Sequence, residues 1–299
     1  MLYDRQKRLL ALVDALGGEV GSLDFQKLLF LYCKDVEAAE PAYEFVPYKY
    51  GGFSFTSYAD KRRLTERGLL VDEERSWKIT SAARVAPQVK PMVRMSIDRF
   101  ARQHADLRGD ALVAEAYRRH PYYATRSEMA ARLFAREPAA RAAIEAARPT
   151  IPNPGIYTIG YEGRSLEGYL NELLRAGVTL LCDVRRNALS RKYGFSRKTL
   201  TTACNGVGIR YEHLPELGIA SDQRRELKSQ ADYDRLFTSY KENDLPKQGE
   251  VLEKIALWIR SGHRVALTCY EAKPCECHRH CVAAALEEEL GVSFGINNL

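Results

Sequence analysis

The sequence lacks the marks of membrane and exported proteins. No stretch approaches about eighteen consecutive apolar residues, so we expect no membrane-spanning helix. The first twenty residues carry charges within their apolar pattern, which indicates an amphipathic helix and not a secretory signal. The seven cysteines are an odd number, and without an export signal we expect reduced thiols. These features predict a cytoplasmic protein with no membrane partner.

Internal repeats and low-complexity tracts are also absent, and neither sign of charge dominates. The formal net charge is +6, a mild excess that permits a polyanionic partner without requiring one. The chain has 299 residues, of which 45% are hydrophobic. That length and composition allow two ordinary domains, each with a packed core that needs no disulfide or metal.

The N-terminal half has the element order of a winged helix. Apolar spacing predicts helices over residues 3–16, 22–36 and 55–67, and LLVDEERSWKIT (69–80) predicts a hairpin. Three helices followed by a two-stranded wing is the order of that fold. We therefore predict a winged-helix-like, mostly α-helical domain over residues 1–84 and a helical connector over residues 85–150.

The C-terminal half predicts an α/β domain. PTIPNPG (149–155) contains three prolines and a glycine, which no helix crosses, so we place the domain boundary there. Beyond it, β-branched and apolar runs such as GIYTIGY and VTLLCDV alternate with amphipathic helical segments. This alternation predicts a Rossmann-like domain over residues 151–299, with a mainly parallel sheet and helices on both faces.

Polar side chains follow three of the predicted strands. Ligands of open parallel sheets bind beyond the carboxyl ends of the strands, so we expect these side chains to line one cleft. A solvated loop is the alternative for each of them taken alone. The residues concerned are Tyr161, Glu162, Arg164, Asp183, Arg185, Arg186 and Glu271.

Basic and aromatic residues are interleaved in RRNALSRKYGFSRK (185–198). Arg191 and Tyr193 lie in this segment, whose composition suits a phosphate backbone together with stacked bases. An exposed flexible loop is the alternative. His213 follows another predicted strand and either lines the same cleft or is a histidine bonded within the core.

The segment CYEAKPCECHRHC (269–281) holds four of the seven cysteines and has three interpretations. In the first, Cys277, His278 and Arg279 lie at a helix N-terminus, where the helix dipole favours anions and lowers a thiol pKa. In the second, zinc binds Cys275, Cys277, His280 and Cys281. That spacing is not a standard zinc motif and a second ligand pair is missing, so we expect no metal and no cofactor.

In the third interpretation, cysteines of this segment pack as small buried hydrophobic residues. We favour this for Cys269 and Cys281, and for Cys33, Cys182 and Cys204 elsewhere in the chain.

Four sequence blocks together resemble a known family. TIGYEGRSLEGYL, LLCDVRRNALSRKYGFSRKTL, GIRYEHLPELG and ALTCYEAKPCECHR are similar, in this order, to the bacterial and archaeal domain-of-unknown-function family 488, over residues 156–290. The resemblance implies a fold and a site but no reaction. The positions that match the family pattern are Gly160, Glu162, Asp183, Arg185, Ser190, Arg191, Phe195, His213, Leu217, Gly218, Cys269, Glu271, Cys277, His278 and Arg279.

The N-terminal half is similar to winged-helix-like modules of prokaryotic regulators and defence proteins, among them the Panacea-type domain. FQKLLFLY and YKYGGFSFTSYADKRRLTERGLL carry this resemblance. Gly52 stands where the Panacea pattern has proline. The resemblance implies a role in regulation, toxin–antitoxin systems or phage defence.

Our first functional hypothesis is a DNA-processing hydrolase, similar to a glycosylase or nuclease, that acts on a modified base or a sugar–base bond. Double-stranded DNA would bind through Lys61, Arg62, Arg63 and Arg67. One of three carboxylates would activate water and His278 would relay protons. The proposed catalytic residues are Glu162, Asp183, Glu271 and His278. The proposed substrate-binding residues are Tyr161, Arg164, Arg185, Arg186, Arg191, Tyr193, His213, Cys277 and Arg279.

The second hypothesis is a non-enzymatic DNA-binding sensor whose α/β domain takes a nucleotide, an anion or an oxidant through Cys277, His278 and Arg279. The third hypothesis is a protein–protein interaction module. The sequence does not decide whether the chain forms a homodimer. The acidic residues discriminate between the first two. Carboxylates that face the cleft without partners favour an enzyme, whereas carboxylates held in structural ion pairs favour a sensor.

Overall fold

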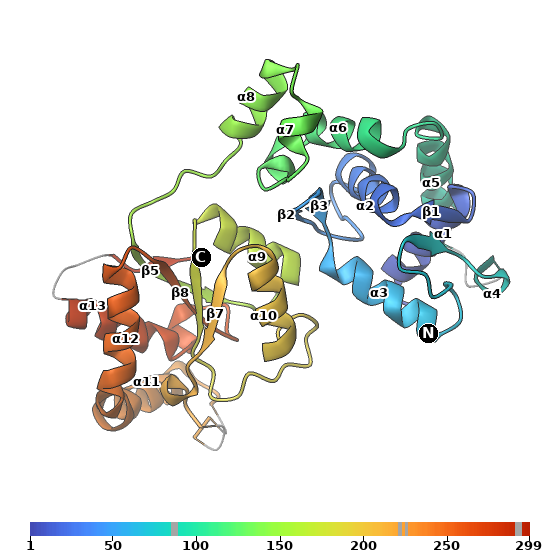
Figure 1. Cartoon of the computed structure of the whole chain (residues 1–299). Helices are drawn as coiled ribbons and strands as arrows, with labels where there is room; N and C mark the ends of the chain where they lie inside the picture. The colour runs from blue at the N-terminus through green and yellow to red at the C-terminus, as the bar shows by residue number, and fades with distance from the viewer. Residues whose placement is uncertain (85–88, 221–222, 225–226, 291–294) are drawn as a thin grey trace. The chain divides into compact units, whose positions relative to one another are not determined.

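The computed structural model describes residues 1–84, 89–220, 223–224, 227–290 and 295–299, and it divides the chain into two compact units. These units are Met1–Arg148 and Pro149–Leu299, so the division falls at the first proline of the proline-rich segment (Figure 1). Within the described residues, no helix combines the length and the apolar character that crossing a membrane requires.

The first unit is mainly helical. Its helices are α1 (Asp4–Ala15), α2 (Ser22–Leu31), α3 (Phe55–Glu66), α4 (Ser81–Arg84), α5 (Pro91–Gln103), α6 (Gly109–Arg119), α7 (Ala130–Leu133) and α8 (Pro138–Ala146), with short π and 3-10 segments η1 (Tyr32–Val36) and η2 (Pro121–Ala124). Its strands are β1 (Glu19–Gly21), β2 (Val46–Tyr48), β3 (Gly51–Phe53) and β4 (Ser76–Lys78). Both strand pairs, β1 with β4 and β2 with β3, are antiparallel.

The two arms of the predicted hairpin at residues 69–80 do pair with each other, but the second arm also pairs with a further strand. Leu70 forms a bridge with Ile79, and β4 pairs on its other side with β1. A second hairpin, β2–β3, lies between α2 and α3, where we predicted no regular element. The winged-helix interpretation of this unit therefore stays a prediction, while its helical character is shown.

One hydrophobic core runs through the whole first unit. Leu9 and Phe25 from its early helices share this core with Phe100, Tyr117 and Phe134 from residues 89–148. The segment that we expected to be a connector thus packs into the same core as residues 1–84. Charge is buried in this unit too, because Lys27 on α2 is only 2% exposed and its ammonium donates to the carbonyl oxygen of Gly52 at 2.9 Å.

The second unit is the predicted α/β domain. Its strands are β5 (Gly155–Gly160), β6 (Leu180–Asp183), β7 (Arg210–His213), β8 (Arg264–Cys269) and β9 (Asn297–Asn298). Its helices are α9 (Leu166–Arg175), α10 (Arg197–Gly206), α11 (Gln230–Ser239), α12 (Gly249–Arg260) and α13 (Arg279–Leu290), with short segments η3 (Pro215–Leu217), η4 (Tyr240–Asp244), η5 (Leu245–Gln248) and η6 (Pro274–Glu276). The strands form one parallel sheet in the order β7-β6-β8-β5-β9, which confirms the predicted class.

Two helical layers cover this sheet. Helices α9 and α10 lie on one side of it, and α12 and α13 lie on the other (Figure 1). Cys182, Leu267 and Cys269 belong to the core that includes α12 and α13. Because side chains alternate along a strand, the neighbours Asp183 and Thr268 point to the opposite face. Helix α11 and strand β9 were not predicted, although α11 begins with a capping box at Ser229.

We predict that Lys27 makes the stability of the first unit depend on pH. Burial lowers the pKa of its ammonium from 10.5 to about 7. Between these two values the unfolded chain binds more protons than the folded chain, so this group makes the free energy of unfolding rise with pH by up to about 1.4 kcal/mol per pH unit. Below about pH 7 both states are protonated and this contribution to the slope disappears. Lys27→Met is expected to remove it.

Urea unfolding between pH 6.5 and 9.5 measures this slope. Trp77 lies in the first unit and is fully buried, so its fluorescence in a Trp258→Phe background reports that unit. Lys90→Met, at an exposed position, is the control and should keep the wild-type slope. Equal slopes for Lys27→Met and the wild type would contradict the assignment.

Candidate functional site

The strand ends that we expected to share one cleft belong to opposite faces of the sheet. The register pairs Asp183 with Thr268 and Gly160 with Cys269. Asp183 and Cys269, the last residues of β6 and β8, therefore point away from each other across the sheet. The structure accordingly divides the predicted residues between two clusters, one around Asp183 and one around Cys269.

The first cluster is a buried ion pair. Asp183 is fully buried and accepts hydrogen bonds from Arg185 Nε at 2.8 Å, from Arg185 Nη2 at 2.5 Å and from the Tyr211 hydroxyl at 2.6 Å. Arg185 also donates through Nη1 to the Tyr161 hydroxyl and to the carbonyl oxygen of Phe195, both at 2.9 Å. Burial opposes the charge of Arg185, but the bonds and charge of Asp183 outweigh it and raise the pKa of the guanidinium. Both oxygens of Asp183 are thus engaged.

Aromatic rings close this cluster. The ring of Tyr161 stacks on Phe195 with centroids 4.4 Å apart and planes 9° apart, and the guanidinium of Arg185 lies 5.0 Å from the Tyr161 centroid. Tyr161 is consequently only 3% exposed. Tyr161 was predicted to bind substrate, but its ring is already stacked within the protein. Tyr270, at the edge of Tyr161, keeps 45% of its surface exposed.

The second cluster, which we call the thiol centre, consists of Cys269, Cys277, His278 and Glu271. The sulfur of Cys269 lies 3.9 Å from His278 Nδ1 and 3.4 Å from Glu271 Oε2. The potential ligand atoms of Cys269, Cys277 and His278 all lie within 4.8 Å of one another, and all three residues are buried. On its other side the His278 ring is fixed, because Nε2 lies 3.0 Å from the carbonyl oxygen of Val184.

The two thiols of this centre titrate in opposite directions. A hydrogen bond from Cys277 lowers the pKa of Cys269 well below 9.0, with further help from His278 and the charge of Arg224, despite the opposing effect of burial. Burial and the neighbouring Cys269 raise the pKa of Cys277 well above 9.0. Burial opposes the charged form of His278, but Cys269 outweighs this and raises the pKa of the imidazole. Within this coupled pair of thiols, the surroundings therefore favour the thiolate on Cys269 over the thiolate on Cys277.

Glu271 joins the thiol centre to a residue that the sequence did not indicate. Its Oε1 forms an ion pair with Arg224, while its Oε2 lies 3.4 Å from the sulfur of Cys269. Arg224 lies outside every element and motif that we predicted, so no sequence signal could have found it. Cys269 did have a signal, because it is the last residue of a buried strand, in the place that Asp183 occupies on β6. We had assigned it to core packing.

Arg279 holds the backbone of the loop after β8. It is 1% exposed, and it donates to the carbonyl oxygens of Glu271 at 2.5 Å and Ala272 at 2.9 Å. Its Nε also donates to Thr158 Oγ1 at 3.3 Å. Glu162 is exposed, and its Oε2 accepts from the Ala272 amide at 3.0 Å. Arg279, expected to bind substrate, therefore directs its guanidinium at protein acceptors.

The predicted basic segment forms an exposed surface, which we call the basic loop. Its four exposed cations are Arg186, Arg191, Arg197 and Lys198, and none of them belongs to an ion pair among the described residues. Arg186 donates to the carbonyl oxygen of Pro215 at 3.2 Å. His213 Nε2 lies 2.9 Å from the carbonyl oxygen of Arg185, which fixes the start of the loop. Arg164 and Tyr193, also predicted to bind substrate, are half-buried.

The basic residues predicted on α3 are only partly available to a ligand. Lys61 is 8% exposed, and its ammonium donates to the carbonyl oxygens of Glu73 at 2.7 Å and Ser76 at 2.6 Å. Arg62, Arg63 and Arg67 are exposed, and Arg67 donates to the carbonyl oxygen of Met1. A cavity of about 380 Å³ beside this helix is lined by Asp72, Glu73 and Glu74 together with Lys61 and Arg62. Acidic side chains thus face these cations.

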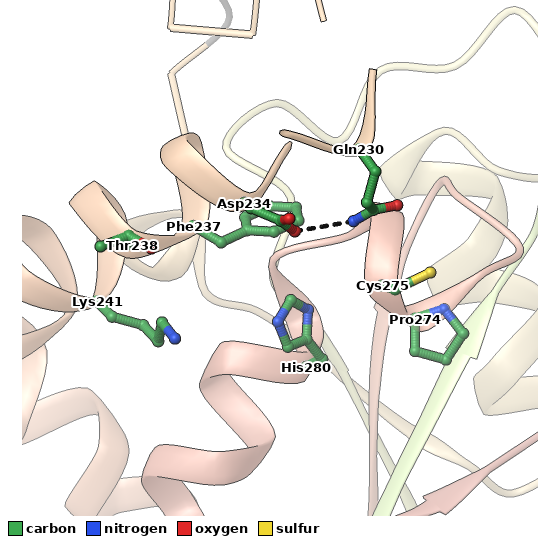
Figure 2. Close-up of a pocket in the computed structure, with 8 residues that line it drawn as sticks. All are labelled: Gln230, Asp234, Phe237, Thr238, Lys241, Pro274, Cys275 and His280. Atoms are coloured by element: carbon green, nitrogen blue, oxygen red, sulfur yellow. Dashed lines mark hydrogen bonds between the residues drawn. The ribbon is translucent and has the colours of Figure 1, made fainter. Parts of the chain in front are cut away.

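The four residues that we considered for zinc do not come together. Figure 2 shows Cys275 and His280 on a surface pocket of about 420 Å³, which residues of α11 also line. Cys275 is exposed, whereas Cys277 is buried in the thiol centre. His280 Nε2 lies 3.3 Å from the sulfur of Cys281. The surface pocket is therefore separate from the ligand atoms that do converge.

We predict that Asp183 stabilises the fold. Asp183→Asn leaves the buried Arg185 charge without its carboxylate, which is expected to cost about 3–5 kcal/mol of unfolding free energy. Tyr211→Phe removes one hydrogen bond to the carboxylate and is expected to cost about 1–2 kcal/mol. Urea unfolding followed by Trp258 fluorescence in a Trp77→Phe background measures both. Asp244→Asn, on the surface at 43% exposure, is the control and should change stability by less than about 0.5 kcal/mol. A loss below about 1 kcal/mol for Asp183→Asn would contradict this role.

Comparison with known proteins identifies one family. Residues 165–286 match the family model described as Domain of unknown function DUF488. Neither the curated proteins nor the solved structures contain a match to the chain. The matched stretch lies within the Pro149–Leu299 unit and includes both clusters apart from Tyr161. The C-terminal half of this chain therefore carries a domain of the family described as Domain of unknown function DUF488, as its sequence blocks predicted.

Proposed function

We propose that the chain is a cytoplasmic nucleic-acid-binding regulator, and that its C-terminal domain senses a ligand that bonds to sulfur. The thiol centre carries this proposal, because it brings two thiols and an imidazole within 4.8 Å of one another at the carboxyl edge of the sheet. That edge is where parallel sheets bind their ligands. A low-pKa thiol beside an imidazole is suited to binding soft ligands.

The state of the carboxylates supports a regulator over a hydrolase. A general base needs an oxygen that is free to accept a proton from water. Asp183 accepts from Arg185 and Tyr211, and Glu271 is engaged by Arg224. Glu162 holds the Ala272 amide through one oxygen. Asp183 and Glu271 are thus structural partners, which is the pattern that favours a sensor, whereas Glu162 is exposed and its second oxygen takes no part in this bond.

The basic loop is the surface that we propose for phosphate contacts. Its exposed cations belong to no ion pair among the described residues, so phosphates can approach them without displacing a carboxylate. On α3, Lys61 and Arg62 line a cavity together with Asp72, Glu73 and Glu74, whose charge repels phosphate. We therefore propose that the C-terminal domain supplies the main electrostatic contacts, and that α3 supplies fewer.

A short path of bonds supports coupling between the thiol centre and the basic loop. His278 contacts the carbonyl oxygen of Val184, and the next residue, Arg185, anchors the loop through the carbonyl oxygen of Phe195. A ligand that shifts His278 therefore acts on the residue that precedes this anchor. Such coupling between two sites typically changes affinity about 5–150-fold.

We predict that the basic loop determines the affinity for polyanions. The double change Arg186→Glu/Arg191→Glu is expected to weaken duplex binding by about 10-fold or more, and to reduce the slope of log K against log salt by about 2, because each lost phosphate contact contributes about 0.9. Fluorescence anisotropy with a labelled duplex at several KCl concentrations measures both quantities. Arg62→Glu/Arg63→Glu is the matched control. A larger loss in this control than in the loop variant would place the contact on α3 instead.

We also predict that occupation of the thiol centre changes duplex affinity. In a Cys275→Ser background, one equivalent of an organomercurial is expected to alter the dissociation constant for duplex about 5-fold or more. Far-UV circular dichroism checks that the fold is unchanged. The matched control carries Cys269→Ser and Cys277→Ser in addition to Cys275→Ser. Its dissociation constant for duplex should not change when the mercurial is added. Unchanged affinity with stoichiometric mercury bound would contradict the regulator, and abasic sites or strand breaks would favour the hydrolase.

A further inference from the structure

The thiol centre has the spacing of a metal site. Zinc with thiolate, imidazole and carboxylate ligands at about 2.0–2.3 Å in tetrahedral geometry places those ligands about 3.5–3.8 Å apart. In this protein, Cys269 Sγ lies 3.9 Å from His278 Nδ1 and 3.4 Å from Glu271 Oε2. Cys277 Sγ lies within 4.8 Å of both Cys269 Sγ and His278. The ligand atoms of Cys269, Cys277 and His278 are therefore near zinc-binding distances, and Glu271 Oε2 reaches this group from beside the sulfur of Cys269.

We propose that the thiol centre binds one zinc ion through Cys269, Cys277, His278 Nδ1 and Glu271 Oε2. This inference rests on the proposed function, for which it names the ligand of the sensing site. Among the described residues, Cys269, Cys277 and His278 are the group of metal-ligating side chains that lies this close together. The set differs from the one that sequence spacing suggested, since only Cys277 belongs to both.

The surroundings of His278 support this assignment independently of the spacing. Its Nε2 lies 3.0 Å from the carbonyl oxygen of Val184, so Nε2 carries the proton and donates it. Nδ1 is then the nitrogen that faces the sulfur of Cys269. A backbone carbonyl that fixes the far nitrogen of a histidine is the usual outer partner of a zinc ligand, because it sets both the tautomer and the direction of the ring.

Charge balance points to a divalent ion. Two thiolates and the Glu271 carboxylate carry three negative charges, and the Arg224 guanidinium compensates one of them through Glu271 Oε1. The remaining two negative charges equal the charge of one zinc ion. When zinc displaces the two thiol protons, the charges of the ion, its ligands and Arg224 compensate one another, as burial favours. In this proposal Glu271 binds zinc through Oε2 and forms its ion pair with Arg224 through Oε1.

Metal titration tests the site directly. The full chain is expected to bind one equivalent of zinc, and cobalt(II) should give the d–d bands of tetrahedral coordination together with thiolate-to-cobalt charge transfer. Cys269→Ser, Cys277→Ser and His278→Ala are each expected to weaken binding at least about 100-fold, and Glu271→Gln about 10–100-fold. Cys275→Ser, His280→Ala and Cys281→Ala are the matched controls and should bind like the wild type.

Two further measurements allow for ligand variants that do not fold. Zinc is expected to raise the melting temperature of the wild type, because it binds the folded chain and not the unfolded one. His278→Cys, which replaces one zinc ligand with another, should keep affinity within about 10-fold where His278→Ala does not. Absence of stoichiometric zinc, cobalt spectra without thiolate charge transfer, or equal binding by the Cys269, Cys277 and His278 variants would overturn the site. A Cys269–Cys277 disulfide in protein purified without oxidant would also overturn it.

Failure of this inference and failure of the proposed function give different results. Stoichiometric zinc that leaves duplex affinity unchanged would keep the zinc site and contradict the regulator. A mercurial effect on duplex affinity without any zinc binding would keep the regulator and overturn the zinc site.

Discussion

The close approach of the loop after β8 to the end of β5 is the contact on which the C-terminal edge of the sheet depends. A Cβ atom on Gly160 would lie 1.8 Å from the carbonyl oxygen of Glu271, so only glycine allows this approach. Arg279 donates to that same carbonyl and to Ala272, and Glu162 accepts from the Ala272 amide. The backbone of Glu271 is thus fixed from three sides. Its side chain, and the thiol of Cys269 two residues earlier, are thereby held in the thiol centre.

The opposite face of the same edge is organised by charge. Burying Asp183 and Arg185 costs several kcal/mol of desolvation for each ion, which their mutual attraction offsets only with good geometry and with partners for the remaining donors. Two parallel bonds join the guanidinium to the carboxylate, and the hydroxyls of Tyr161 and Tyr211 complete the set. Through the bond from Arg185 to the carbonyl oxygen of Phe195, this network also ties the start of the basic loop to a later point in it.

Sequence pattern predicts the sheet but not which residues meet at its edge. Strands β5, β6 and β8 are buried on both faces and read as continuous apolar runs, and this is why the parallel sheet and its polar strand ends were predictable. Which face each end points to depends on register, which a one-residue shift reverses. Asp183 and Cys269 were therefore assigned to one cleft although they point apart. Lys61 could not be recognised as internal, because its partners are backbone carbonyls, which every sequence contains.

The hydrogen bond from His278 to the carbonyl oxygen of Val184, the residue before Arg185, bears on which arrangement of the basic loop a metal would favour. A ligand shifts a conformational equilibrium only by its difference in affinity between the two states. Zinc on His278 Nδ1 keeps the proton on Nε2, and therefore keeps the bond to the carbonyl oxygen of Val184. Zinc on Nδ1 is therefore compatible with the arrangement of Arg185 and the basic loop described above. The proposed coupling then acts by stabilising this arrangement, with its exposed cations, relative to others that the loop adopts.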